Sequence, residues 1–171
     1  MNGNDAAQYF MREALSLAHE AAQAGEVPVG AVIVHDGRVI SAARNRTEER
    51  KDPLAHAEML AIQEALCAVG GWRLKNCDMY VTLEPCQMCA GALVQSRIDR
   101  VEPCAMCAGA IVHARIRNLF IGAPDPKTGA CGSVMNITAD PHLNHHPQVV
   151  TGILKEECSG ILKEFFRQLR R

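Results

Sequence analysis

Two apolar runs on either side of Asp36-Gly37 limit the folds open to this chain. Asp-Gly between such runs is a strong signal for a β-hairpin. Apolar residues recur at helical spacing over about 5–24 before the hairpin and over about 55–69 after it. The order of helix and strand signals predicts an α/β protein. Its remaining elements are strands at 78–83 and 118–123 and a strongly amphipathic helix within 153–170.

The length and composition fit one domain that spans residues 1–171. Of the 171 residues, 48% are hydrophobic and 4% are aromatic, which suits a core of aliphatic side chains. The polar segment 45–54 is predicted to be a loop. The net charge is −1, so binding to a nucleic acid would need a local basic patch. Two clusters qualify: Arg44, Arg46, Arg50 and Lys51, and Lys163, Arg167, Arg170 and Arg171.

The N-terminal residues MNGNDAAQYF lack the basic and apolar regions of a signal peptide. We also find no apolar run approaching the roughly 20 residues that span a membrane. These features predict a cytoplasmic protein without a membrane anchor. Paired cysteines in that compartment are metal ligands or redox sites more often than disulfides.

An 18-residue segment occurs twice in tandem. EPCQMCAGALVQSRIDRV (84–101) is followed directly by EPCAMCAGAIVHARIRNL (102–119), and 11 of the 18 positions are identical. Each copy carries one C-x-x-C pair, on a segment that we expect to begin a helix at its proline. Pro103 argues against one continuous helix through both copies.

His56, Glu58 and one C-x-x-C pair together suggest a catalytic zinc site. Three protein ligands leave the fourth zinc position to water, and His56 with two cysteines could supply them. Cysteines in the first turn of a helix favour the thiolate that binds metal. Glu58 could then take a proton from the water and return one to a leaving amine. Residues 56 and 58 can reach the same point only from a first helical turn.

The chain resembles the bacterial tRNA-specific adenosine deaminase family along almost its whole length. His-Ala-Glu followed by Pro-Cys-x-x-Cys is the signature of the zinc deaminases. The further matching stretches are residues 27–31, Asn45, 55–58, 81–86, 88–92, 122–133, 143–145 and the basic C-terminal helix.

The resemblance implies a three-layer α/β/α cytidine-deaminase-like fold with a mixed sheet of about five strands. It implies a zinc-dependent homodimer that acts on the wobble adenosine of a tRNA anticodon stem-loop. Glu58 would be the catalytic residue, and His56, Cys86 and Cys89 the zinc ligands. The substrate-binding residues would be Asn45, Val27, Pro28, Ala57, Pro85 and Asp125.

The duplication leaves two ligand sets open. Cys86 and Cys89 directly follow the strand at 78–83, whereas Cys104 and Cys107 keep the family's distance to the loop at 122–133. We favour the first pair, because the strand that delivers it is intact. Two rival functions also remain: a deaminase of free bases or nucleosides, and a zinc-stabilised binding module without activity.

Overall fold

In the computed structural model, a five-stranded mixed sheet organises the part of the chain that is described. That part comprises residues 3–71, 73–86, 88–89, 117–141 and 146–169. The strand order is β2-β1-β3-β4-β5. The strands are β1 (Gly30–His35), β2 (Arg38–Arg44), β3 (Cys77–Leu83), β4 (Asn118–Ala123) and β5 (Gln148–Thr151).

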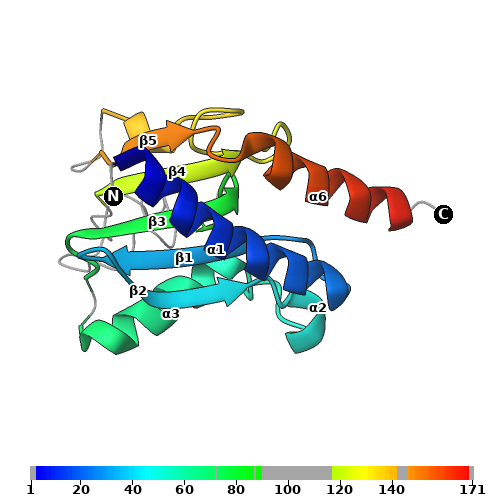
Figure 1. Ribbon diagram of the computed structural model, residues 1–171, viewed down its shortest axis with the longest axis horizontal. Helices are drawn as coiled ribbons and strands as arrows, with labels where there is room; N and C mark the ends of the chain where they lie inside the picture. The colour runs from blue at the N-terminus through cyan, green and yellow to red at the C-terminus, as the bar shows by residue number, and fades with distance from the viewer. Residues whose placement is uncertain (1–2, 72, 87, 90–116, 142–145, 170–171) are drawn as a thin grey trace.

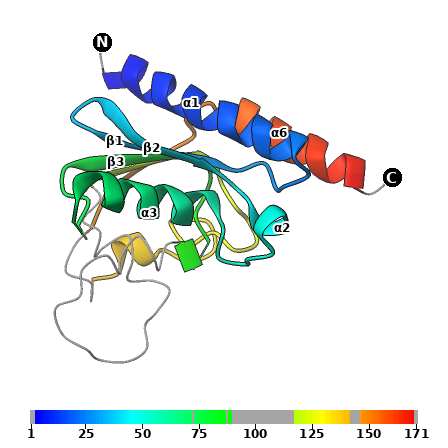
Figure 2. The same ribbon diagram turned by 90° about the horizontal axis from the view of Figure 1, so that it is seen from below.

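Helices cover both faces of the sheet, as the expected three-layer arrangement requires (Figures 1 and 2). Helices α1 and α6 lie side by side on one face, and α3 covers the other. The helices are α1 (Gly3–Gln23), the short α2 (Thr47–Arg50), α3 (Ala57–Val69), the 3-10 turn η1 (Ile137–Ala139) and α6 (Lys155–Leu169). Among the described residues, none of the helices is both long enough and apolar enough to cross a membrane.

The core is divided between the two faces by the alternation of side chains along the strands. In β1, Ala31 and Ile33 pack in the cluster beneath α3. Val32 and Val34 of the same strand pack instead against α1, in a second cluster that also contains Cys158 of α6. A strand buried on both faces carries a continuous apolar run, which explains the sequence AVIV at 31–34.

The hairpin prediction is confirmed. Strands β1 and β2 pair antiparallel, and His35 lies opposite Arg38. Asp36 and Gly37 between them have φ values of 48° and 74°. Two successive positive φ angles are what a two-residue type I′ turn requires.

The sheet changes from antiparallel to parallel pairing at β3. Strand β3 pairs antiparallel with β1 and parallel with β4. The carboxyl ends of β3 and β4 therefore lie at one edge, where Leu83 is opposite Ala123. The segments after these two strands, which begin at Glu84 and Pro124, are consequently brought together there.

Three details differ from the sequence-based expectations. The predicted loop 45–54 contains α2, and no strand was foreseen at β5. Cys86 was expected within a helix, but it forms an isolated bridge with Gly129, and the described helical residues there begin at 88. Backbone pairing with the 124–133 loop explains this, because the amide of Ala130 also donates to the carbonyl of Pro85.

Close packing of α1 against β1 at Gly30 gives a testable prediction. A Cβ atom on Gly30 would collide with the carbonyl oxygen of Ala14 and lie 2.8 Å from the amide nitrogen of Ala18. Both obstacles are backbone atoms, which have little room to move. Gly30→Ala should therefore lower the free energy of unfolding by about 1–3 kcal/mol.

Gly71→Ala is the matched control, because a Cβ there meets no atom of the described residues within 4 Å. Thermal unfolding of both variants checks the prediction: the melting temperature should fall by several degrees for Gly30→Ala only. Equal melting temperatures would contradict the packing described for α1.

Candidate metal centre and its surroundings

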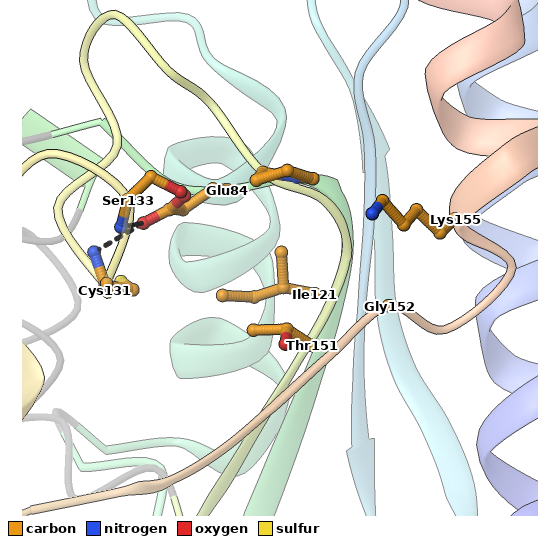
Figure 3. A pocket seen from close by; sticks show the side chains of 9 residues that line it. Glu84, Ile121, Cys131, Ser133, Thr151, Gly152 and Lys155 are labelled. Carbon is orange, nitrogen blue, oxygen red and sulfur yellow. Dashed lines mark hydrogen bonds between the residues drawn. The ribbon is translucent and has the colours of Figure 1, made fainter.

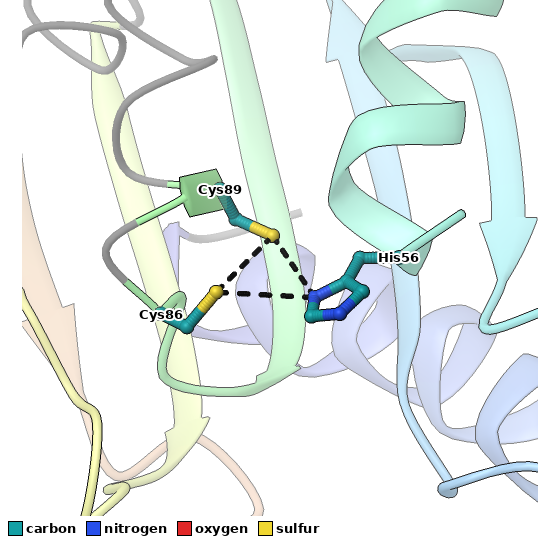
Figure 4. A group of neighbouring side chains, drawn as sticks. All are labelled: His56, Cys86 and Cys89. Carbon is teal, nitrogen blue, oxygen red and sulfur yellow. Dashed lines mark hydrogen bonds between the residues drawn. The ribbon is translucent and has the colours of Figure 1, made fainter. Parts of the chain in front are cut away.

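His56, Cys86 and Cys89 bring three metal-ligating atoms together (Figure 4). His56 is the residue before the first turn of α3 and has an extended backbone, with φ −71° and ψ 150°. The two cysteines come from the segment after β3. The imidazole thus points from the start of α3 toward the edge at which β3 and β4 end.

The separations of these atoms fit a tetrahedral zinc ion. The sulfurs of Cys86 and Cys89 are 3.7 Å apart, and Nδ1 of His56 lies 3.9 Å from the first and 3.3 Å from the second. Ideal zinc bond lengths and tetrahedral angles give about 3.8 Å between two sulfur ligands and about 3.6 Å between sulfur and nitrogen. The donor set of one imidazole and two thiols is likewise one that zinc prefers.

One of the two thiols, that of Cys86, is electronically prepared for a metal. The hydrogen bond with Cys89 lowers the pKa of Cys86 to about 4, against the opposing effect of burial. Cys86 is therefore a thiolate at neutral pH, and the thiolate is the form that binds metal. The same hydrogen bond, together with burial, raises the pKa of Cys89.

Glu58 lies beside the three candidate metal ligands and is not part of their cluster. It occupies the first turn of α3, is 4% exposed and has a side-chain interaction with Cys89. Burial raises the pKa of its carboxyl group above the ordinary range. The sequence requires His56 and Glu58 to lie at the start of a helix if both are to reach one point. The structure meets this requirement, because His56 directly precedes α3 and Glu58 is the second residue of that helix.

The predicted substrate-binding residues fall into two places around this centre. Ala57 and Pro85 are buried next to the ligands, and Asn45 is buried after β2. A cavity of about 450 Å³ opens beside His56 and is also lined by Thr47, Glu48, Lys51, Asp52 and Pro53.

Val27 and Asp125 line a different and larger groove, of about 700 Å³, against α6. Pro28, next to Val27, is buried. The groove is also lined by Leu83, Pro124, Pro126, Lys127, Thr128, Leu162, Lys163, Phe166 and Arg167. Burial raises the pKa of Asp125, but hydrogen bonds from Thr128 and Lys127 outweigh this effect and lower it overall.

The two basic clusters differ in their surroundings. Arg44 and Arg46 both pair with Glu49, and Lys51 pairs with Glu48, so much of the first cluster is neutralised. In the second cluster, Lys163 and Arg167 line the larger groove. Arg170 and Arg171 lie outside the described residues, as do Cys104 and Cys107 of the second copy.

Sequence reasoning missed Glu84, which ties the cysteine segment to the loop at 124–133 (Figure 3). Its buried carboxylate accepts hydrogen bonds from the backbone amides of Asp125, Cys131 and Ser133, at 2.8–3.1 Å, and from the Ser133 hydroxyl. Buried carboxylates are rare unless paired or hydrogen-bonded. The placement of Glu84 directly after a buried strand was the available signal.

Comparison with known proteins identifies the family. The family described as "Cytidine and deoxycytidylate deaminase zinc-binding region" matches residues 4–102. A tRNA-specific adenosine deaminase of Bacillus subtilis is 44% identical over 96% of this chain and 91% of its own length. One from Aquifex aeolicus is 46% identical over 95% of both chains. The chain belongs to the family of zinc-dependent tRNA-specific adenosine deaminases.

Solved structures agree with this membership. A structure from a study of A-to-I editing by tRNA:A34 deaminases has a TM-score of 0.75 and 44% identity, and it covers 90% of this chain and 99% of its own. A guanine deaminase of Nitrosomonas europaea shares the fold, with a TM-score of 0.69 at 21% identity over 92% of this chain and 83% of its own. A second family, the MafB19-like deaminases, matches residues 99–170. The two family matches therefore meet at the junction between the 84–101 and 102–119 copies.

The arrangement of ligands predicts which cysteines this adenosine deaminase needs for zinc. Cys86→Ser should abolish stoichiometric zinc binding, because a serine hydroxyl is a poor replacement for a thiolate ligand. Cys104→Ser should leave one zinc per chain. Metal analysis of purified, dialysed protein checks both.

Cys67→Ser is the control, since Cys67 is an exposed cysteine of α3 outside the ligand cluster. Loss of zinc in Cys104→Ser with retention in Cys86→Ser would show that the second copy holds the metal.

Proposed function

We propose that this chain converts adenosine to inosine at the wobble position of a tRNA anticodon by zinc-dependent hydrolysis. In this reaction a bond forms between C6 of the base and an oxygen from water, the bond from C6 to the amine breaks, and ammonia leaves. The observation that carries the proposal is the convergence of His56, Cys86, Cys89 and buried Glu58. It occurs in a chain 44% identical to a tRNA-specific adenosine deaminase.

The three clustered residues are proposed as the zinc ligands, through Nδ1 of His56 and the sulfurs of Cys86 and Cys89. Zinc bound there would lower the pKa of a water molecule and so supply the nucleophile at neutral pH. Zinc bound by only three protein ligands fits catalysis, because structural zinc sites are normally closed by four. An inactive zinc-binding module is therefore the weaker interpretation.

Glu58 is proposed as the group that moves protons. Its carboxylate would accept a proton from the attacking water and deliver it to the amine that leaves C6. Burial supports this role, because a carboxyl group with a raised pKa holds and releases a proton more readily near neutral pH. A purely structural site would have no need of such a residue.

The first copy of the repeat is proposed to form the site. The loop at 124–133 is present once, and its amides already bond to Glu84 and Pro85 of the first copy. Glu102 and Pro103 of the second copy could not use the same donors at the same time. If Cys104 and Cys107 were the ligands, Glu102 and Pro103 would have to replace Glu84 and Pro85 in all of these hydrogen bonds.

An RNA substrate is favoured by the larger groove. Lys163 and Arg167 offer positive charge to a phosphate backbone, and Phe166, which is 44% exposed, offers an aromatic face to an unstacked base. Asn45, Val27, Pro28, Ala57, Pro85 and Asp125 are proposed to contact the substrate, as the family resemblance implies. A free base would need none of the groove, so this feature argues against a small-molecule deaminase.

The wider setting of the enzyme stays a prediction. We propose one deaminase domain over residues 1–171, a homodimer and a cytoplasmic location. The family resemblance supports the first two, and a tRNA substrate supports the third.

The activity can be tested on an anticodon stem-loop with adenosine at the wobble position. The zinc-loaded protein should form inosine there, and it should leave free adenine, guanine, cytosine and cytidine unchanged. Mass spectrometry of the digested nucleosides measures both. Turnover of a free base without action on the stem-loop would contradict the proposed substrate.

Glu58→Ala provides the control for the chemistry in the same assay. It should keep one zinc per chain while the rate falls by about a hundred- to ten-thousand-fold, the usual contribution of a positioned acid–base group. A stem-loop with guanosine at the wobble position should yield no inosine with either protein.

A further inference from the structure

Glu26 is a buried carboxylate to which the proposed mechanism gives no task. It lies between α1 and β1, next to Val27, and its relative exposure is 0%. Burial of an ionised carboxylate is costly unless hydrogen bonds compensate for the lost water. The partners of Glu26 therefore indicate what the residue is for.

One set of partners comes from the short helix α2. Oε1 of Glu26 accepts a hydrogen bond from the amide of Glu49 at 2.7 Å, and Oε2 accepts one from the amide of Glu48 at 3.2 Å. Arg46, the residue before α2, provides no side-chain cap of its own. Glu26 thus satisfies amides at the start of α2 that the helix leaves free. Burial raises the pKa of Glu26, but these bonds outweigh it and keep the pKa below the ordinary value.

The other partner is the side chain of Asn45. Its Nδ2 donates to Oε2 of Glu26 at 3.2 Å and to Oγ1 of Thr47 at 3.1 Å. The hydroxyl of Thr47 itself donates to Oε2 of Glu26, at 3.1 Å. An ionised carboxylate only accepts hydrogen bonds, so the nitrogen of the Asn45 amide must face Glu26. Nδ2 thus faces Glu26 and Thr47, and Oδ1 is the atom that remains for a substrate.

These groups lie near His56 of the candidate metal centre. The amide of Arg46, next to Asn45, donates to the carbonyl of Ala55, directly before His56. Thr47 and Glu48 line the same 450 Å³ cavity as His56. A carboxylate that fixes Asn45 and the start of α2 therefore also fixes one wall of this cavity.

We propose that Glu26 is a positioning residue that orients the Asn45 amide so that its Oδ1 accepts a hydrogen bond from the nucleoside. The group recognised must then be a donor, such as a hydroxyl of the ribose. This inference rests on the proposed function, because it assigns Asn45 to the nucleoside site.

Exchanging the carboxylate of Glu26 and the amide of Asn45 between the two positions tests the proposal. Asn45→Asp places a second carboxylate against Glu26 and should lower kcat/KM on the stem-loop by about a hundredfold or more. Adding Glu26→Gln would turn an amide donor toward the introduced carboxylate, whose second oxygen still offers an acceptor to the substrate. The double variant should then recover at least about tenfold in kcat/KM over Asn45→Asp alone.

Glu49→Gln combined with Asn45→Asp is the matched control. Glu49 is a carboxylate of α2, but its side chain pairs with Arg44 and Arg46 and not with Asn45. If kcat/KM also recovered in this double variant, the recovery would come from the change in net charge alone, and the proposal would be overturned. The proposal would also be overturned if kcat/KM fell equally in Asn45→Asp and in the double variant Asn45→Asp with Glu26→Gln, provided that both proteins retain zinc and melt cooperatively.

A second measurement does not depend on the folding of the Asn45 variants. In the amide NMR spectrum of the substrate-free protein, the side-chain amide proton of Asn45 that faces Glu26 should shift upfield in Glu26→Gln, because its acceptor loses its charge. An unchanged shift would overturn the proposal. Absence of inosine with the wild-type protein would instead refute the proposed function, and the NMR result would still decide whether Glu26 orients Asn45.

Discussion

The meeting of the start of α3 with the segment after β3 is the contact on which the rest of the site depends. His56 and Glu58 come from the first, and Cys86 and Cys89 from the second. A parallel pair of strands brings the segments that follow them to one edge. The β3–β4 pair therefore supplies both the cysteines and the loop that holds them. The sheet is in this sense the scaffold of a small metal site at its edge.

Two buried carboxylates, Glu84 and Glu26, hold together the segments at this edge. Glu84 collects three amides and a hydroxyl from the loop at 124–133, and Glu26 collects two amides, a hydroxyl and the Asn45 side chain. Each carboxylate replaces water by fixed donors, which compensates for much of the cost of its burial. The donors belong to segments that carry site residues, so stability and site geometry depend on the same bonds. Such supporting contacts are what hold a catalytic group in a productive position.

Sequence reasoning identified much of the framework and the chemistry, and the reasons for its failures are physical. The hairpin at Asp36-Gly37, the long helices and four of the strands follow from local periodicity and turn residues. Strand β5 has four mostly exposed residues at the sheet edge and therefore carries no alternation. Helix α2 is similarly short and depends on Glu26, which lies more than 20 residues earlier. Cys86 left its expected helix because of backbone pairing with distant Gly129.

The tandem repeat makes zinc coordination the decisive property of this chain, because it carries two C-x-x-C pairs and a single His-Ala-Glu. X-ray absorption at the zinc K-edge measures the ligands directly in the full-length protein. The account predicts two sulfur neighbours at about 2.3 Å and two nitrogen or oxygen neighbours at about 2.0 Å. Four sulfur neighbours would mean that both cysteine pairs close around the metal and leave no position for water, which would contradict the catalytic centre described above.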